Sequence, residues 1–464
     1  MEKHLTHPVF KIISSCANQL GVEAFVIGGF VRDLFLNRES KDIDVVTLGK
    51  GIALAELVHQ QLPDSYLSVF KNFGTAQVKF HDLEIEFVGA RKESYNHNSR
   101  KPTVETGSLK DDQDRRDFTI NALAIGLTEA NFGKLLDPFQ GVLDIERKII
   151  KTPLQPDITY SDDPLRMLRA IRFATQLGFT IEEKSFEAIT KNKKRIDIVS
   201  KERIADELNK IILSPIPSVG FKLLFDCGLL HLIFPEMVKL YGVETVNGKS
   251  HKDNFYHTLE VLDNVSKMSD NLWLRWAAIL HDIAKPNTKR FEPDHGWTFH
   301  GHEDKGARMV PKIFENLRLP LNEKMKYVQK LVLLHLRPIV LAKTEISDSA
   351  VRRVLFEAGD DVDDLMKLCQ ADITTKNPNK VKRYLQNFEI VKTKLKEIEE
   401  KDHIRNWQPP VSGEEIMSLF NLPPSKTVGD LKNALKDAIL DGVISNDKAE
   451  ALTFLSAKMK EIQH

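Results

Sequence analysis

Two acidic residues near the N-terminus have the spacing of a metal site. In the run Lys41-Asp42-Ile43-Asp44-Val45, carboxylates alternate with apolar residues, a pattern that predicts a β-strand. Side chains two positions apart in a strand point to the same face, so Asp42 and Asp44 share one. Two carboxylates on one face repel each other unless a cation lies between them. Mg²⁺, which prefers oxygen ligands and bridges nucleotide phosphates, is the ion that we expect there.

A pair of glycines precedes these acids. The apolar run Ala24 to Ile27 predicts a strand that ends at Gly28 and Gly29, and Phe30 to Leu36 then continues with helical spacing. Glycine lets a backbone approach phosphates closely, and the free N–H groups at the start of a helix favour an anion. Combined with the acids, the glycines indicate metal-dependent nucleotidyl transfer. The alternative is that Asp42 and Asp44 are ordinary acids of an edge strand.

A second ion would need a third carboxylate. Glu84 and Glu86 occupy alternate positions of the predicted strand Leu83 to Val88, so that either or both can join the acid pair. The residue pattern alone leaves this choice open.

A second cluster begins with adjacent His281 and Asp282, which follow the apolar run Trp276 to Leu280. At the end of a helix, both can face one metal ion. The order of these and other residues along the chain resembles the HD phosphohydrolase superfamily. This resemblance implies the ligands His257, His281, Asp282 and Asp372, with His302 and His335 as candidates for a second ion. Such mixed ligands suit Mn²⁺, Ni²⁺, Fe²⁺ or Zn²⁺. A site that only stabilises the helices is the alternative to catalysis.

The elements that position these residues fall into two regions. Residues 24–150 alternate short β-branched runs with turns and short helices, including predicted strands at Ile43 to Thr47 and Thr75 to Phe80. From Asp163 onward, apolar residues recur at helical spacing nearly to the C-terminus. The pattern predicts an α+β head with a small mixed sheet, followed by an all-α body.

Composition narrows the class of protein. The 464 residues exceed what one hydrophobic core usually organises, so we expect two to four domains. Lys and Arg together number 66, as do Asp and Glu, so any nucleic acid must be held by local positive patches. Three widely spaced cysteines exclude a thiolate zinc knuckle and a disulfide scaffold. With neither a signal peptide pattern nor a bilayer-length apolar run, we expect a cytoplasmic protein without a membrane partner.

Several motifs, in order, resemble one family. The segment Gly28 to Asp33, followed by Asp42-Ile43-Asp44, resembles the first motif of the class II CCA-adding tRNA nucleotidyltransferase and bacterial poly(A) polymerase family, in the DNA polymerase beta superfamily. Arg115 to Ala122 is similar to its ribose-discriminating and triphosphate-contacting motif, Asp163 to Phe173 to its base-selecting motif, and Glu202 to Lys210 to its neck-helix motif. The resemblance covers roughly the first half of the chain.

The resemblance implies the site residues and their ligands. Because the third acid of the family precedes a basic position, here Arg91, it implies Glu86 rather than Glu84 as the third catalytic carboxylate beside Asp42 and Asp44. The expected partners are tRNA, CTP and ATP, with Mg²⁺ as cofactor. The resemblance implies that Asp117 contacts the nucleotide, and the alternative is that Asp117 has only a structural role. The full set of expected nucleotide contacts is Gly28, Gly29, Arg32, Arg115, Arg116, Asp117, Asn121, Asp163, Arg166, Arg169 and Arg172.

Base selection can also be argued from chemistry. Asp163 and Arg166 are three apart, hence neighbours on one helix face. A carboxylate accepts and a guanidinium donates, an order that suits cytosine and adenine but not uracil or guanine. An exposed ion pair is the alternative. The sequence departs from the family at Asp162, where the family usually has Glu to orient the template arginine, which puts the details of base switching in doubt.

The expected domains are a nucleotidyltransferase head (1–150), a helical neck (151–240), an HD domain (245–378) and a C-terminal helical domain (379–464). The expected activity is addition of CCA to tRNA without a nucleic-acid template. The alternatives are a poly(A) polymerase of the same family, or a phosphohydrolase whose head only binds RNA. The polar segment 95–113 corresponds, by resemblance, to the flexible loop of the family, which argues against addition of CC alone. The sequence does not define an oligomeric state.

Overall fold

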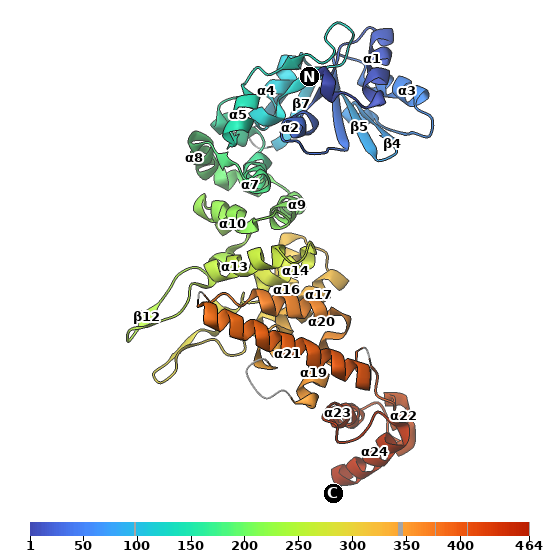
Figure 1. Cartoon of the computed structure of the whole chain (residues 1–464), viewed down its shortest axis with the longest axis vertical. Helices are drawn as coiled ribbons and strands as arrows, with labels where there is room; N and C mark the ends of the chain where they lie inside the picture. The colour runs from blue at the N-terminus through green and yellow to red at the C-terminus, as the bar shows by residue number, and fades with distance from the viewer. Residues whose placement is uncertain (97–98, 342–346, 376, 406, 464) are drawn as a thin grey trace. The chain divides into compact units, whose positions relative to one another are not determined.

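The computed structural model describes residues 1–96, 99–341, 347–375, 377–405 and 407–463 (Figure 1). The chain divides into two compact units, Met1–Pro235 and Glu236–His464. The first begins with a mixed sheet and continues as helices, and the second is mostly helical. The predicted fold class, an α+β head followed by a helical body, is confirmed. The finer division into four domains stays a prediction.

Within the described residues, the head contains a seven-stranded sheet in the order β3-β4-β5-β2-β1-β8-β9. The sheet is mixed because β2 and β5 run parallel, whereas the other neighbours are antiparallel. The predicted strands are confirmed as β1, β2, β4 and β5; the others were not predicted. The strands are β1 (Ala24–Ile27), β2 (Asp42–Thr47), β3 (Tyr66–Phe70), β4 (Thr75–Phe80), β5 (Leu83–Gly89), β8 (Ala124–Gly126) and β9 (Leu135–Leu136).

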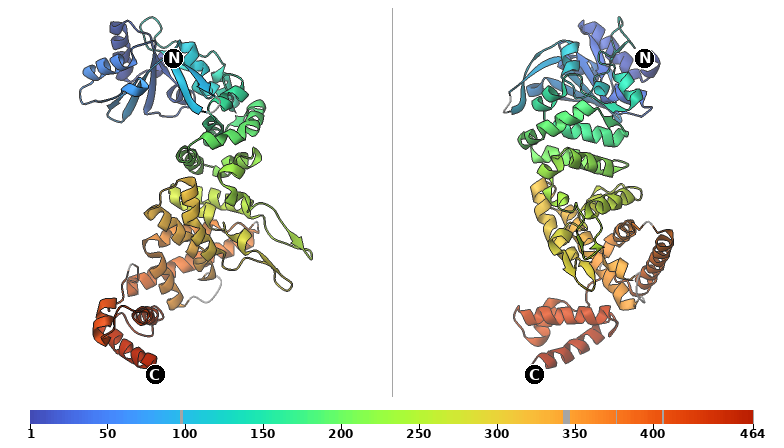
Figure 2. Two further views of the ribbon diagram at one scale, coloured as in Figure 1. Left: turned by 180° about the vertical axis from the view of Figure 1, so that it is seen from behind. Right: turned by 90° about the vertical axis from the view of Figure 1, so that its left-hand side faces the viewer.

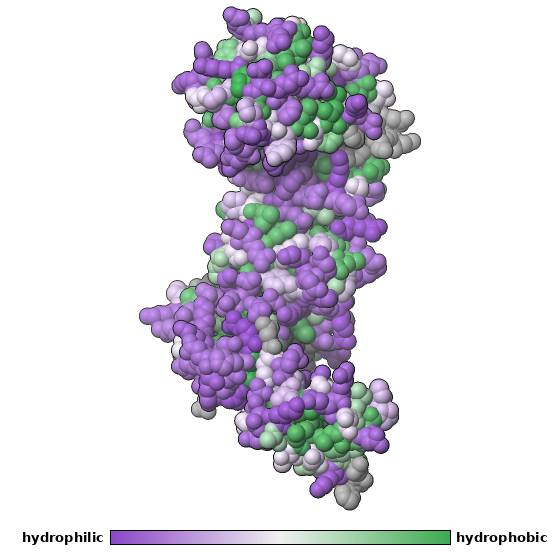
Figure 3. All heavy atoms as spheres, turned by 90° about the vertical axis from the view of Figure 1, so that its right-hand side faces the viewer, coloured by the Kyte–Doolittle hydropathy of each residue, from purple (hydrophilic) through white to green (hydrophobic). Residues whose placement is uncertain are grey.

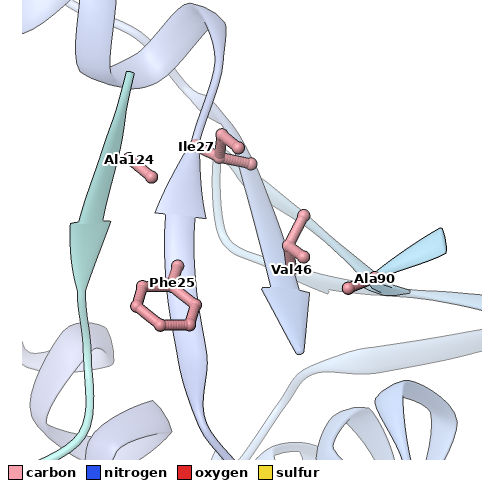
Figure 4. Close-up of a cluster of buried hydrophobic side chains, with 5 residues drawn as sticks. All are labelled: Phe25, Ile27, Val46, Ala90 and Ala124. Atoms are coloured by element: carbon pink, nitrogen blue, oxygen red, sulfur yellow. The ribbon is translucent and has the colours of Figure 1, made fainter. Parts of the chain in front are cut away.

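One face of this sheet changes from apolar to acidic along β2. In the antiparallel register, Ile27 of β1 lies opposite Asp44 of β2, so their side chains share a face. The apolar part of that face is a buried cluster (Figure 4), formed by Phe25, Ile27, Val46, Ala90 and Ala124. The hydrophobic core therefore fixes the strand that carries the carboxylates.

The opposite face of the sheet is covered by helices. Ile43 and Val45 of β2, with Ile85 and Phe87 of β5, are almost completely buried. Helix α3 (Gly51–Gln61) packs on β4 and β5, and α1 (Pro8–Leu20) packs on α3. The alternation of apolar and acidic residues in β2 is the predicted one, because one face meets these helices and the other, with exposed Asp42 and half-buried Asp44, meets a cavity.

Shorter elements complete the head. The hairpin β6 (Arg91–Asn96) and β7 (Ser99–Thr106) precedes α4 (Leu109–Asp114). These elements occupy most of the segment expected to be a flexible loop; its residues 97 and 98 lie outside the described residues, and the correspondence stays a prediction. The remaining elements are α2 (Gly29–Phe35), α5 (Gly141–Arg147) and the parallel pair β10 (Ile149–Ile150) and β11 (Thr180–Ile181).

The neck helices follow within the first unit. Helix α7 contacts both α9 and α10, and α6 packs on α8. Buried Arg172 of α7 donates a hydrogen bond from Nε to Oε2 of Glu207 on α9 at 2.6 Å. The helices are α6 (Pro156–Asp162), α7 (Leu165–Leu177), α8 (Glu183–Asn192), α9 (Lys201–Ile212), α10 (Pro217–Asp226) and α11 (Leu229–Ile233). The short helix α12 (Pro235–Val238) begins at the last residue of the first unit and continues into the second.

The second unit is a body of helices from which two hairpins project (Figures 1 and 2). Its helices are α13 (Asn254–Ser266), α14 (Leu272–Leu280), α15 (Lys285–Thr288), α16 (His302–Leu317), α17 (Glu323–Leu334), α18 (Arg337–Leu341), α19 (Asp348–Ala358), α20 (Val362–Ala371), α21 (Pro378–Asp402), α22 (Gly413–Phe420), α23 (Lys426–Leu440) and α24 (Lys448–Gln463).

The hairpins depart from the helical pattern expected after Asp163. One joins β12 (Thr245–Val246) to β13 (Lys249–Ser250), and the other joins β14 (Arg290–Glu292) to β15 (Gly296–Thr298). Both turns use glycines at positive φ, which side-chain-bearing residues rarely adopt. Such short strands carry too few residues for a strand period, so apolar periodicity does not detect them.

The face of the molecule seen in Figure 3 is mostly hydrophilic, with hydrophobic areas between. In the described part of the chain, no helix combines the length and apolar character required to cross a bilayer. The three cysteines, Cys16, Cys227 and Cys369, are buried and free.

Candidate functional site

Strand pairing brings the predicted acids of the head together. In the parallel register, Asp42 lies beside Glu84 and Asp44 beside Glu86, which places all four on one face of the sheet. They line a cavity of about 520 Å³ that also reaches helices α2 and α7. The members of the predicted set that line it are Gly29, Arg32, Asp42, Asp44, Glu86, Arg116, Asp117, Asn121, Arg169 and Arg172.

The electrostatics of these acids differ. Burial raises the pKa of Asp44, Arg116 opposes the rise and Asp42 adds to it. Burial and the charge of Asp44 likewise raise the pKa of Glu86. Glu84 instead accepts hydrogen bonds from Lys79 at 3.0 Å and from Gln77 at 3.3 Å. Glu84 is thus satisfied by its neighbours, and this supports Glu86 as the third acid of the cluster.

The glycine turn is required sterically. Gly28 has φ +84°, and a Cβ there would lie 2.9 Å from Nη1 of Arg116 and 3.2 Å from Oδ2 of Asp44. Any side chain at this position would therefore displace an arginine and a carboxylate of the cavity, in addition to straining the backbone.

A buried acid that the sequence analysis missed holds the two arginines of the Arg-Arg motif. Both oxygens of Asp112, which is fully buried, accept hydrogen bonds. Arg115 donates to Oδ1 from Nε at 2.9 Å and also from Nη2, and Arg116 donates to Oδ2 from Nε at 3.3 Å. Arg115 also contacts Glu93 at 3.3 Å. The spacing of three and four residues between Asp112 and the arginines is a helical signal that could have identified it.

Asp117 orients two other predicted contacts. Its Oδ1 accepts a hydrogen bond from Asn121 at 3.0 Å, and its Oδ2 accepts one from Nε of Arg169 at 2.8 Å. Burial alone would raise the pKa of Asp117, but the charge of Arg169 and these hydrogen bonds lower it to about 2. Asn121 in turn accepts from Nη1 of Arg32 at 2.9 Å. The predicted structural alternative for Asp117 therefore has support, since it positions neighbours that line the cavity.

The residues predicted to select the base, Asp163 and Arg166, are not in the lining of this cavity. Oδ1 of Asp163 accepts a hydrogen bond from the N–H of Leu165 at 3.2 Å. Nη2 of Arg166 donates to the backbone carbonyl of Arg115 at 2.5 Å. Arg166 thereby connects α7 to the Arg-Arg motif. Burial raises the pKa of neighbouring Asp162, and the charges of Arg166 and Arg195 oppose the rise.

In the second unit, the predicted histidines present the same ring nitrogen inward. The Nδ1 of His281 lies 2.8 Å from the carbonyl oxygen of Ala278, and His302 and His335 make equivalent contacts at 2.7 Å. A carbonyl only accepts, so each Nδ1 carries the proton and each Nε2 has a free lone pair. Such orientation by a carbonyl is typical of histidines that bind metals.

These nitrogens and two carboxylates form two candidate metal triads. One consists of His257, His281 and Asp372, and the other of Asp282, His302 and His335; within each triad the ligand atoms lie within 4.8 Å of one another. Asp282 joins the triads because its Oδ2 lies 3.2 Å from Nε2 of His281, and its Oδ1 lies 3.2 Å from Nε2 of His302. All six predicted HD residues therefore meet.

The buried groups of this cluster fit a cation. Nε2 of His281 is buried without a hydrogen-bond partner, and Nε2 of His302 faces Nε2 of His335 at 3.3 Å. Oδ2 of Asp282 is buried and lies 2.6 Å from the ammonium nitrogen of Lys285, so a positive charge already adjoins this carboxylate. Burial lowers the pKa of His335 to about 3, which keeps that imidazole neutral. Unprotonated nitrogens and carboxylate oxygens that face one another are the donor set of a transition metal.

A cavity of about 560 Å³ adjoins the first triad at Asp372. Its apolar wall includes Ile339, with Tyr384 and Phe388 from α21, and Lys252 lies at its edge. Nζ of Lys252 lies 3.1 Å from Nδ1 of His257. The cluster is therefore open to a molecule that has both an anionic and an apolar part.

Comparison with known proteins agrees with these two sites. Family models match as poly A polymerase head domain over residues 24–151, as probable RNA and SrmB-binding site of polymerase A over 178–240, and as HD domain over 254–373. The A-adding tRNA nucleotidyltransferase of Deinococcus radiodurans is 32% identical over 76% of this chain and 80% of its own. The CC-adding tRNA nucleotidyltransferase of Thermus thermophilus is 30% identical over 93% of both chains. The chain belongs to the tRNA nucleotidyltransferase family.

Solved structures show the same fold for this tRNA nucleotidyltransferase. The structure of the Bacillus stearothermophilus CCA-adding enzyme in complex with CTP matches with a TM-score of 0.68 at 22% identity, over 100% of this chain and 99% of that one. The motif resemblance found in the sequence is thus confirmed at the level of the family and the fold. The matches to the poly A polymerase head domain and to the HD domain both imply dependence on divalent metal ions.

Proposed function

We propose that the head adds CMP and AMP, from CTP and ATP, to the 3′ end of tRNA so that the tRNA ends in CCA. The observation that carries the proposal is the meeting of Asp42, Asp44 and Glu86 with the arginines Arg32 and Arg116 around one cavity. Carboxylates hold divalent ions, and guanidinium groups bind phosphates. This arrangement suits attack of a tRNA 3′-hydroxyl on the α-phosphorus of a nucleoside triphosphate, with pyrophosphate as the leaving group.

Asp42 and Asp44 would hold Mg²⁺, with Glu86 beside them. The fit rests on neighbouring acids whose pKa values burial raises, because a cation between them would offset both burial and their repulsion. When bound, Mg²⁺ supplies positive charge that lowers the pKa of the attacking hydroxyl and stabilises the leaving oxygens. Arg32 and Arg116 would bind the phosphates, and Glu86 would help to activate the hydroxyl.

Asp163 and Arg166 would select the base. The Arg166 guanidinium donates a hydrogen bond to the carbonyl of Arg115, which fixes it beside the Arg-Arg motif. A donor on Arg166 and an acceptor on Asp163 match cytosine and adenine. The two relatives named above are an A-adding and a CC-adding enzyme. The selection of both bases by this chain is our proposal.

The test is incubation of purified protein and Mg²⁺ with a tRNA that lacks its CCA end, with each nucleotide alone and then with CTP and ATP together. We expect CMP addition from CTP alone and a complete CCA end from the mixture. Addition of A alone, of CC alone or of a long A tail would replace our proposal by an A-adding enzyme, a CC-adding enzyme or a poly(A) polymerase. No addition to this tRNA, and none to a tRNA that already ends in CC, would favour a head that only binds RNA.

We propose phosphoester hydrolysis as a second activity, at the two triads of the second unit. The specific observation is the set of four imidazoles and two carboxylates next to the cavity that reaches Asp372. Mn²⁺, Ni²⁺, Fe²⁺ or Zn²⁺ would be held by these ligands, and a bound ion supplies hydroxide near neutral pH. Lys252 would attract the anionic group of the substrate, and the apolar wall would receive the rest.

This second activity is tested by loading the protein with each of the four metals in turn. Hydrolysis of 2′,3′-cyclic phosphates or phosphomonoesters is expected with at least one metal. If none supports hydrolysis of either substrate while the metal is bound, the proposal fails for these substrates. The triads would then be better described as a structural metal site.

A further inference from the structure

Three arginines surround one aromatic ring in the cavity that Asp42, Asp44 and Glu86 line, which we call the transferase cavity. Phe173 lies on α7, lines the cavity and is only 6% exposed. The guanidinium carbons of Arg172, Arg32 and Arg169 lie 3.9, 5.1 and 5.4 Å from the centroid of its ring. A guanidinium within about 6 Å of a ring centroid is attracted by the negative face of the ring. All three arginines are therefore within the range of this attraction.

Each arginine also has an acidic partner of its own. Arg32 pairs with Asp33 at 2.9 Å, Arg169 with Asp117 at 2.7 Å, and Arg172 with Glu207 at 2.6 Å. These acids come from different parts of the first unit, so each one attracts only its own guanidinium group. The ring, by contrast, is shared by all three, and it offsets the repulsion of like charges that converge on one cavity.

The ring is itself fixed by the Arg-Arg motif. Phe118, which is fully buried and follows Asp117, packs edge-on against Phe173 with 5.8 Å between centroids and an interplanar angle of 81°. Edge-to-face packing of this kind restricts the orientation of both rings. The orientation of Phe173 therefore links the helix that carries Arg32 to the helix that carries Arg169 and Arg172.

We propose that Phe173 is a positioning residue whose ring face holds these three guanidinium groups ready for the triphosphate of the incoming nucleotide. This inference rests on the nucleotide site proposed above. Its ligand class is a nucleoside triphosphate, whose polyanionic chain needs several fixed cations. A receptor whose cations are already in place loses less entropy on binding. Reducing the negative charge on the face of the Phe173 ring should therefore weaken nucleotide binding more than it slows the chemical step.

The experiment replaces Phe173 by phenylalanines with one, two and three ring fluorines, which withdraw charge from the ring face with little change in size. We expect the KM for CTP and ATP, and the Kd for a nonhydrolysable CTP analogue, to rise stepwise with fluorination, by up to about tenfold. The kcat should stay within about twofold and the thermal midpoint should be unchanged. Phe173→Tyr should retain most of the affinity, and Phe173→Leu should lose it.

Phe179 provides the matched control. It is also buried, at 7% exposure, and within the described part of the chain no cation lies over its ring. The same fluorine series at Phe179 should leave Kd and KM unchanged. A Kd that stays constant across the series at Phe173, or one that changes only as the thermal midpoint falls, would overturn the inference. If the unmodified protein binds the analogue but adds no nucleotide, the proposed reaction fails while Kd still decides the role of Phe173; if it binds no nucleotide, both fail.

Discussion

Arg172 and Glu207 form a buried ion pair that joins two helices of the neck, with 2.6 Å between Nε and Oε2. Their side chains are 10% and 4% exposed, so neither charge is well solvated. Burial lowers the pKa of Arg172, and the charge of Glu207 opposes this. The pair therefore compensates a buried charge and also orients an arginine that lines the cavity of the head.

Glu207→Ala should destabilise the protein by about 3 kcal/mol, because it leaves the Arg172 charge buried without its partner. Chemical denaturation followed by circular dichroism measures this. Asp206→Ala, at an exposed position of the same helix, is the matched control and should change stability by less than about 0.5 kcal/mol. Equal effects of the two changes would show that the pair contributes nothing.

Asp44→Ala should reduce addition of CMP and AMP by more than about a hundredfold, because it removes a proposed ligand of the metal ions. Affinity for tRNA should stay within a few-fold, since the helices are unchanged. Primer extension and filter binding measure the two quantities. Asp82→Ala, at an exposed turn of the same sheet, should retain activity. Normal addition by the Asp44 variant would place the active site elsewhere.

Arg166→Ala should weaken discrimination against UTP and GTP by about 1–3 kcal/mol, the range of one bidentate base contact. The proposed metal ligands are unchanged, so the rate with CTP should fall less than selectivity does. Competition between CTP and UTP in primer extension gives the ratio, with Arg147→Ala as an exposed control. A uniform loss of rate at unchanged selectivity would argue against base reading by Arg166.

Asp117 should make stability depend on pH in the acid range. Its pKa is about 2 in the folded chain and 3.8 ordinarily, so its contribution is complete above about pH 4 and is lost as the pH falls through 2. The difference corresponds to about 2 kcal/mol. Asp117→Asn should therefore be less stable than the parent at pH 6, and the two should converge towards pH 2. A stability difference that is the same at both pH values would contradict this, and urea unfolding across the range measures it.

Replacing His281 and Asp282 together by Ala should abolish binding of the transition metal, because each candidate triad loses a ligand. Addition of nucleotides should persist, since the acids of the transferase cavity are unchanged. Elemental analysis of the purified variant gives the metal content. His295→Ala, an exposed histidine outside the triads, should retain the metal. Full metal occupancy in the double variant would exclude these ligands.

Sequence patterns predicted those candidate site residues that lie close along the chain to the residues they act with. The alternation around Ile43 predicted that Asp42 and Asp44 share a face, and register with β5 then added Glu86. The role of Glu207 was not predictable, because its partner Arg172 is 35 residues away and meets it only through helix packing. The environment of Phe173 was hidden for the same reason, as Arg32 comes from a different helix. Asp112 had a local signal, but its burial depends on the folded head.

The histidines His281, His302 and His335 each rest on a carbonyl three residues earlier in their own backbone. Each ring is consequently oriented by a local turn of the chain: the carbonyl belongs to the preceding helix for His281 and His335, and to Phe299, just before α16, for His302. These contacts orient the three proposed ligands independently of one another, because each ring uses only its own segment of the chain.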